Sequence, residues 1–145
     1  MSALGNILPL SILVTEQSEV QRTKDILKRD TQWISSEVIN GQENVTADWK
    51  RQGLIFSVDD GERELFPAYQ FDAAWQPIPV IKDILANLHD MTDGWKIAAW
   101  FHFPSSWLSY RKSDGTVAPV APKDALDRGP DVIAAARKIS ASYVA

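Results

Sequence analysis

The residue types that enzymes use for catalysis are scarce in this chain of 145 residues, and their spacing predicts no reaction. The chain has no cysteine and only two histidines, His89 and His102. This excludes a disulfide framework, a zinc–thiolate site and a thiol nucleophile. His102 lies in the aromatic run 100–103, which favours a packed histidine over a catalytic base. No histidine or carboxylate spacing matches a metal site, and no glycine-rich phosphate loop or Gly-x-Ser-x-Gly turn is present. We therefore expect no catalytic residue, no metal, no cofactor and no enzymatic activity.

Tryptophan is the residue type that stands out, with six in the chain. Trp95, Trp100 and Trp107 lie within thirteen positions of one another, together with Phe101 and Phe103. Aromatic side chains are enriched at protein interfaces, where a buried anchor can contribute about 2 kcal/mol or more. The alternative is that all five belong to the core. The aromatic cluster therefore indicates either a core or a surface that binds a partner.

Charge and hydropathy limit the other partners. The 15 basic and 19 acidic side chains give a net charge of −4, which counts against binding nucleic acid through bulk charge. The apolar segment 7–14 is much shorter than the ~20 residues that span a bilayer, and no basic residue precedes it as in a signal peptide. We expect no membrane partner, an N-terminal arm that packs on the fold or on a second copy, and a cytoplasmic location.

The elements of the first half follow the order of a winged helix-turn-helix unit. Helical periodicity covers residues 18–29, and short helices are expected from Ser35 through Ile39 and over residues 43–52. Residues 54–58 and 62–66 are expected to form a strand pair around the turn 59–61, because Asp-Gly between apolar runs favours a hairpin. We assign residues 1–66 to this winged-helix-like unit and residues 67–145 to a second, helical domain.

In a winged-helix unit the second helix of the pair enters the major groove of DNA. The candidate DNA-binding residues are then Asn44, Thr46, Lys50, Arg51 and Arg63. However, the span from Val20 to Phe66 holds seven basic and nine acidic residues, and the expected wing tip is acidic. The unit is therefore either a DNA reader or a scaffold used for packing.

The second half shows mainly helical patterns. Residues 67–79 form an aromatic, proline-containing connection, followed by expected helices at 80–88 and 94–101 and one further turn at 105–108. Residues 109–120 are expected to form a polar loop or small hairpin. A short helix at 123–127 and a final helix from Pro130 complete the chain. The expected fold class is mainly α with a small β-hairpin, with the winged-helix-like N-terminal half packed on a helical C-terminal bundle.

Several ordered motifs carry a family resemblance. They are Leu65-Phe66-Pro67-Ala68-Tyr69-Gln70-Phe71-Asp72, Pro77-x-Pro79, Gly94-Trp95-x-x-Ala98-x-Trp100-Phe101, Pro104-Ser105-Ser106-Trp107-Leu108 and Pro122-Lys123-Asp124-Ala125-Leu126. From about Gly53 to the C-terminus the chain resembles the toxin-binding domain of Xre/MbcA/ParS-type antitoxins, in the variant with a winged-helix-like N-terminal half. Residues 109–121 form an insertion relative to that pattern.

The resemblance implies a bacterial antitoxin that binds and neutralises a cognate toxin, usually of the RES type, which attacks NAD⁺ or transfers ADP-ribose. It also implies a homodimer and, often, repression of its own operon through a DNA operator. The toxin-binding residues that it implies are Trp95, Trp100, Trp107, Leu108, Pro122, Leu126, Arg137, Lys138 and Tyr143. Two alternatives remain, a winged-helix transcription regulator and an orphan scaffold that has no toxin.

Overall fold

The computed structural model describes residues 17–40 and 44–144, with side chains except at residue 40 and from residue 140 onward. The chain divides into two units, residues 1–30 and 31–145. The described part of the first unit is a helix over residues 17–30, close to the expected 18–29. The apolar segment 7–14 lies outside the described residues. The expected domain boundary after residue 66 stays a prediction, and the following paragraphs concern residues 31–145.

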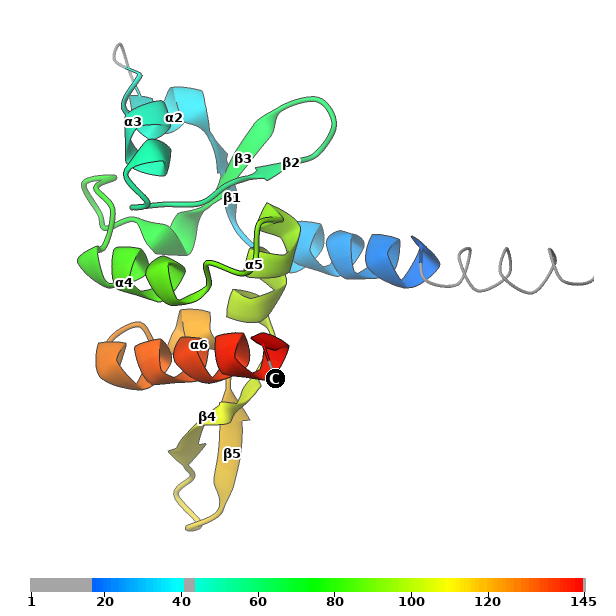
Figure 1. The fold of residues 1–145 in the computed structure, drawn as a ribbon, viewed down its shortest axis with the longest axis vertical. Helices are drawn as coiled ribbons and strands as arrows, with labels where there is room; N and C mark the ends of the chain where they lie inside the picture. The colour runs from blue at the N-terminus through cyan, green and yellow to red at the C-terminus, as the bar shows by residue number, and fades with distance from the viewer. Residues whose placement is uncertain (1–16, 41–43, 145) are drawn as a thin grey trace, which may run out of the picture. The chain divides into compact units, whose positions relative to one another are not determined.

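A three-stranded antiparallel sheet and two short helices beside it form the first part of this unit (Figure 1). The elements run in the order β1 (Trp33–Ser35), α2 (Ser36–Asn40), α3 (Val45–Arg51), β2 (Val58–Asp59) and β3 (Glu64–Pro67). Strand β3 is central, so the sheet order is β1-β3-β2. Strand β1 was not expected from the sequence, because three residues are too few to show the alternation that marks a strand.

Helix α3 ends where the sequence predicts, at a glycine. Gly53 has a φ of 75°, a conformation that costs glycine little, and its N–H donates to the Lys50 carbonyl at 3.0 Å. The turn between β2 and β3 also has the expected chemistry. The side chain of Asp59 accepts a bond from the Gly61 N–H, and that of Asp60 accepts bonds from the N–H groups of residues 62 and 63.

The strand expected at residues 54–58 is shorter in the structure, because Gln70 holds the backbone before β2. The fully buried Gln70 side chain accepts a bond from the Phe56 N–H at 2.8 Å and donates to the Phe56 carbonyl at 2.9 Å. These bonds replace the ladder bonds that a longer strand would make. The nearby core consists of Ile55, Phe66 and Phe71, with Trp49 and Trp75 packed against it.

Three helices form the second part of the unit, and their buried residues follow helical spacing. Helices α4 (Pro79–Asn87) and α6 (Gly129–Val144) pack against each other (Figure 1). Helix α5 (Gly94–His102) buries Ile97, Ala98 and Phe101. Its start lies against the strand region, since a Cβ atom at Gly94 would come within 2.0 Å of the Ser57 carbonyl oxygen. Two 3₁₀ turns lie in the connections: η1 (Ala68–Gln70) between β3 and α4, and η2 (Pro122–Asp124) shortly before α6.

The expected fold class is wrong, because the β content is larger and lies partly in the second half. Strands β4 (Ser105–Arg111) and β5 (Val117–Val120) form a second antiparallel sheet, which includes residues 105–108, where a helical turn was expected, and residues 109–120, where a loop or small hairpin was expected. The turn at Asp114-Gly115 closes this hairpin, with Gly115 at a φ of 89° and Asp114 accepting two bonds from Thr116. Ser105 pairs with Val120 and residues 109–111 pair with residues 117–119, with an irregularity between the two paired parts. The segment 105–108, which local pattern alone assigns to a helical turn, therefore lies within strand β4. The chain remains mainly helical, with two small sheets.

No helix in the described part of the chain is both long enough and apolar enough to cross a bilayer.

Candidate functional site

The five residues predicted to contact DNA have different environments in the structure. Thr46 is 3% exposed and therefore belongs to the core, whereas Asn44 is exposed just before α3. Lys50 and Arg51, at the end of α3, are exposed, and so is Arg63 beside the β2–β3 turn. Four of the five side chains are thus accessible on α3 and the adjacent hairpin.

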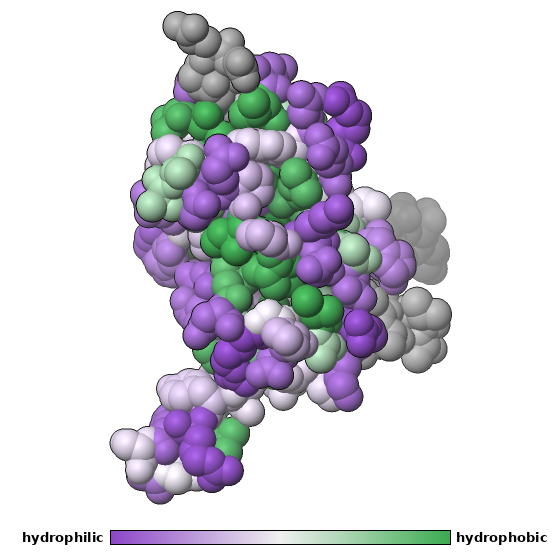
Figure 2. Space-filling view, turned by 90° about the vertical axis from the view of Figure 1, so that its left-hand side faces the viewer, coloured by the Kyte–Doolittle hydropathy of each residue, from purple (hydrophilic) through white to green (hydrophobic). Residues whose placement is uncertain are grey.

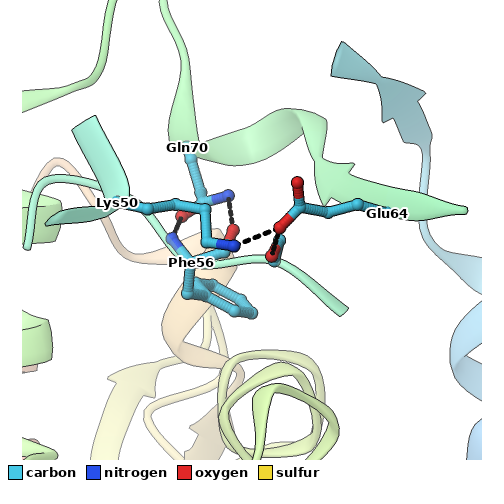
Figure 3. Close-up of polar contacts among 5 residues, drawn as sticks. Lys50, Phe56, Glu64 and Gln70 are labelled. Carbon is cyan, nitrogen blue, oxygen red and sulfur yellow. Dashed lines mark hydrogen bonds and ion pairs between the residues drawn. The ribbon is translucent and has the colours of Figure 1, made fainter. Parts of the chain in front are cut away.

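Lys50 links α3 to the central strand of the sheet (Figure 3). Its ammonium group donates to the carboxylate of Glu64, and the Ser57 hydroxyl donates to the same carboxylate oxygen at 2.6 Å. Partial burial raises the pKa of Glu64, but the hydrogen bonds from Lys50 and Ser57 and the charge of Lys50 lower it by more. The pKa of Glu64 is therefore below its ordinary value. Lys50 consequently positions α3 on the sheet as well as contributing charge.

Arg51 is more exposed than Lys50, with 72% of its side chain accessible against 41% for Lys50. It forms an ion pair with Asp48 one turn earlier on α3. Arg63 is exposed at the end of the hairpin turn, where it faces solvent beside the acidic residues of the turn. On α3 and the β2–β3 hairpin, each of these cations therefore lies beside carboxylates, and the described residues of this surface form no continuous basic patch.

The second candidate site is a groove between the end of α5, the start of β4 and α6. It has a volume of about 250 Å³. We call it the aromatic groove, and its lining residues are Ala99, Trp100, Phe103, Pro104, Ser105, Ser106, Trp107 and Ile139. Two predicted toxin-binding residues, Trp100 and Trp107, thus lie in one groove. They come from different elements, since Trp100 belongs to α5 and Trp107 to β4.

Trp107 is 50% exposed, and Lys138 of α6 lies over its ring, with the ammonium nitrogen 5.0 Å from the centroid. This cation–π contact fixes one wall of the aromatic groove. Arg137, the neighbour of Lys138, is exposed. Trp100 packs edge-on against the buried Phe101, which holds its ring at the other wall.

The remaining predicted toxin-binding residues do not join this groove. Trp95 packs edge-on against Trp33, and its indole N–H donates to the Asp59 carbonyl at 3.1 Å, so it connects α5 to the β2–β3 hairpin. Leu108 and Pro122 are buried in the core, and Leu126 is half-buried. The side chain of Tyr143 lies outside the described residues.

Six lining residues of the aromatic groove are absent from the predicted site, and the two with large apolar side chains are Phe103 and Ile139. Phe103, at 39% exposure, was part of the aromatic cluster but was not chosen as a contact. Ile139 belongs to α6, and its place in the groove with Trp107 depends on how α6 packs on β4. No sequence signal short of the tertiary packing identifies Ile139.

A second hollow lies on another face of the same unit. Figure 2 shows apolar side chains gathered across the middle of the face formed by α3 and the start of α4. A hollow of about 330 Å³ there is lined by Trp49, Leu54, Gln76, Pro77, Ile78, Pro79 and Lys82. It combines an apolar floor with one ammonium group, but it contains none of the predicted site residues.

Within the described residues, no three histidine, aspartate or glutamate side chains come together as a metal site.

Comparison with known proteins identifies a similar fold but no family. No protein-family model and no curated protein sequence matches this chain. The NMR structure of Rv2175c is similar, with a TM-score of 0.59 and 21% sequence identity, over 77% of this chain and 82% of that chain. At this level of identity the similarity concerns the fold alone.

Proposed function

We propose that the chain is a DNA-binding regulator that uses α3 and the β2–β3 hairpin to contact duplex DNA. The observation that carries this proposal is the order α2–α3 followed by an antiparallel hairpin within the sheet β1-β3-β2. In helix-turn-helix proteins the second helix of such a pair lies in the major groove and a following hairpin reaches the flanking backbone. Asp48 and Arg51 on α3, and Asn44 just before it, are exposed for such a contact.

The ion pairs of this surface are compatible with DNA binding. An exposed ion pair contributes about 0–1 kcal/mol, so Arg51 can exchange Asp48 for a phosphate at little cost. The acidic residues of the hairpin turn repel the phosphate backbone, because both carry negative charge. We therefore expect modest affinity and a small number of phosphate contacts, with base contacts from α3 supplying preference for one sequence.

The test is binding of the full chain to fluorescently labelled duplex DNA from its own upstream region, at several salt concentrations. Arg51→Ala and Arg63→Ala should each weaken binding, and each should reduce the salt slope by about 0.9 if the side chain meets one phosphate. Lys82→Ala, an exposed lysine on α4, is the matched control and should leave binding unchanged. Equal binding by all three variants, or binding without sequence preference, would contradict the proposal.

A second function, capture of a partner protein, is favoured by the aromatic groove. Exposed aromatic side chains around a small apolar hollow are typical of protein interfaces. The resemblance to antitoxins suggests the partner, a toxin encoded next to this chain. The two functions are compatible, since an antitoxin that represses its own operon combines DNA binding with toxin binding.

Co-expression with the product of the neighbouring gene tests this second function. We expect a stable complex, relief of toxicity, and loss of both with Trp107→Ala or Trp100→Ala. Val38→Ala is the control, because Val38 is 54% exposed on α2, outside the groove. A neighbour that is harmless alone and forms no complex would exclude the antitoxin assignment.

A further inference from the structure

Exposed apolar side chains concentrate around the aromatic groove and the hairpin that follows it. Six large apolar side chains are exposed in the described part of the chain. Four of them lie between the end of α5 and β5, namely Phe103, Trp107, Tyr110 and Val117. Phe103 and Trp107 line the groove together, and adjoining exposed aromatic side chains of this kind mark a candidate interaction site.

The size of the aromatic groove indicates what fills it. Its volume of about 250 Å³ is below the roughly 300–1,000 Å³ that small-molecule sites occupy. A hollow of this size, walled by Trp100 and Trp107, suits one large apolar side chain of a partner protein. Such an anchor in a desolvated hollow is the usual form of a binding hot spot.

The surroundings of the groove are cationic in an otherwise acidic unit. Residues 105–139 carry six basic and four acidic side chains, whereas residues 31–104 carry five basic and eleven acidic ones. Two of the four acidic groups are already engaged, because Asp131 pairs with Arg128 and Asp114 accepts bonds from Thr116. Lys138 of α6 lies over the Trp107 ring at the wall of the groove, so a carboxylate-bearing partner is the complementary one.

The hairpin itself is not built to accept an added strand. The Lys112 N–H donates to the Thr116 carbonyl, which fixes the register of the hairpin. In this register the backbone groups of residues 110 and 118 bond to each other, whereas those of residues 109, 111, 117 and 119 point away from the partner strand, toward the open edges. On the β5 edge the outward position holds Pro119, which has no N–H to donate. On the β4 edge the Ser109 carbonyl accepts a bond from Arg128 at 2.8 Å. Both edges are thus blocked at this level of the hairpin.

We infer that the aromatic groove binds an acidic segment of a partner protein, with one large apolar side chain in the groove and a carboxylate on Lys138. The segment docks through side chains and does not extend the β4–β5 sheet. This inference rests on the partner-binding part of the proposed function and adds the chemistry of the partner. It is independent of DNA binding.

Selection of random peptides displayed on phage, with the full chain as bait, tests this chemistry without assuming a partner. Each round removes peptides that also bind the Trp107→Ala variant, so only groove-dependent peptides remain. We expect the survivors to combine Asp or Glu with one Trp, Phe or Leu. Synthetic survivors should bind the wild-type chain at least about tenfold more tightly than the Lys138→Glu variant. Lys82→Glu, a charge reversal on α4, is the control and should bind like wild type.

The outcomes separate the inference from the function on which it rests. Groove-dependent peptides that are neutral or basic would overturn the acidic chemistry while leaving the groove as a protein-binding surface. The absence of any groove-dependent peptide would count against both. Circular dichroism of the Trp107→Ala and Lys138→Glu variants must match wild type, and since both side chains are exposed we expect them to fold.

Discussion

The buried amide of Gln70 offers the sharpest test of how this fold is held together. Gln70→Met preserves the length and most of the volume of the side chain but removes both of its bonds to the backbone of Phe56. The Phe56 N–H and carbonyl then stay buried without a partner. Each such group costs about 1–3 kcal/mol, so the free energy of unfolding should fall by about 2–6 kcal/mol. Proteins of this size have about 5–15 kcal/mol in total, so the variant should be close to unfolding.

Urea unfolding followed by tryptophan fluorescence measures this effect directly, because Trp49 and Trp75 pack against the core next to Gln70. The midpoint should fall without a change in the slope, since the same surface is exposed on unfolding. In thermal unfolding the midpoint should fall by roughly 8 °C or more, at about 4 °C per kcal/mol.

Gln76→Met is the matched control, because the same substitution at an exposed glutamine removes no buried bond. It should change the free energy of unfolding by less than about 0.5 kcal/mol. If Gln70→Met were as stable as Gln76→Met, the clamp on Phe56 would contribute nothing. The account of why the strand before β2 is short would then be refuted.

Three further substitutions test other contacts. Gly94→Ala places a methyl group within 2.0 Å of the Ser57 carbonyl oxygen, so the urea midpoint should fall by the equivalent of about 1–3 kcal/mol, and an unchanged midpoint would contradict this packing. Burial raises the pKa of Tyr69 well above its ordinary value, so the folded state holds the proton longer than the unfolded state and loses stability as the pH rises above about 10. Tyr69→Phe should remove that part of the alkaline loss and leave neutral stability equal or higher, because the buried hydroxyl has no hydrogen-bond partner. The pKa of Glu64 is lower in the folded state than in the unfolded state. The ionised carboxylate therefore stabilises the fold at a pH above the pKa of the unfolded state, and this stabilisation is lost as the pH falls through the pKa of the folded state. Glu64→Gln should therefore lose less stability than wild type on acidification, and parallel urea midpoints across pH would refute this.

Local sequence patterns correctly predicted the positions of most helices. Gly53 ends α3 and the apolar spacing of α4 and α6 matches their buried faces, because capping and periodicity act within a few residues. The β2–β3 turn was also predictable, since Asp59 and Asp60 bond to the backbone of their own turn. The short strand β1 and the strand at Ser105–Leu108 were not predictable, because each depends on a partner strand distant in the sequence.

For the candidate sites too, some features could be predicted from the sequence and others only from the structure. The sequence alone indicated that the aromatic cluster is either part of the core or a surface that binds a partner, and that the expected DNA-reading unit is acidic. It could not tell which tryptophans share a surface. Trp95 and Trp107 belong to one cluster in the sequence, but the first packs on Trp33 and the second lies in the aromatic groove.

The sequence by itself determined the residue chemistry of this protein: no thiol, few histidines, many tryptophans and an acidic balance. It also determined the helix ends and turns, whose causes are local. Only the tertiary structure decided the pairing of Ser105 with Val120, the clamp of Gln70 on Phe56 and the position of Lys138 over Trp107. These contacts join segments far apart in the chain, and their free energy depends on packing and burial that no local pattern contains.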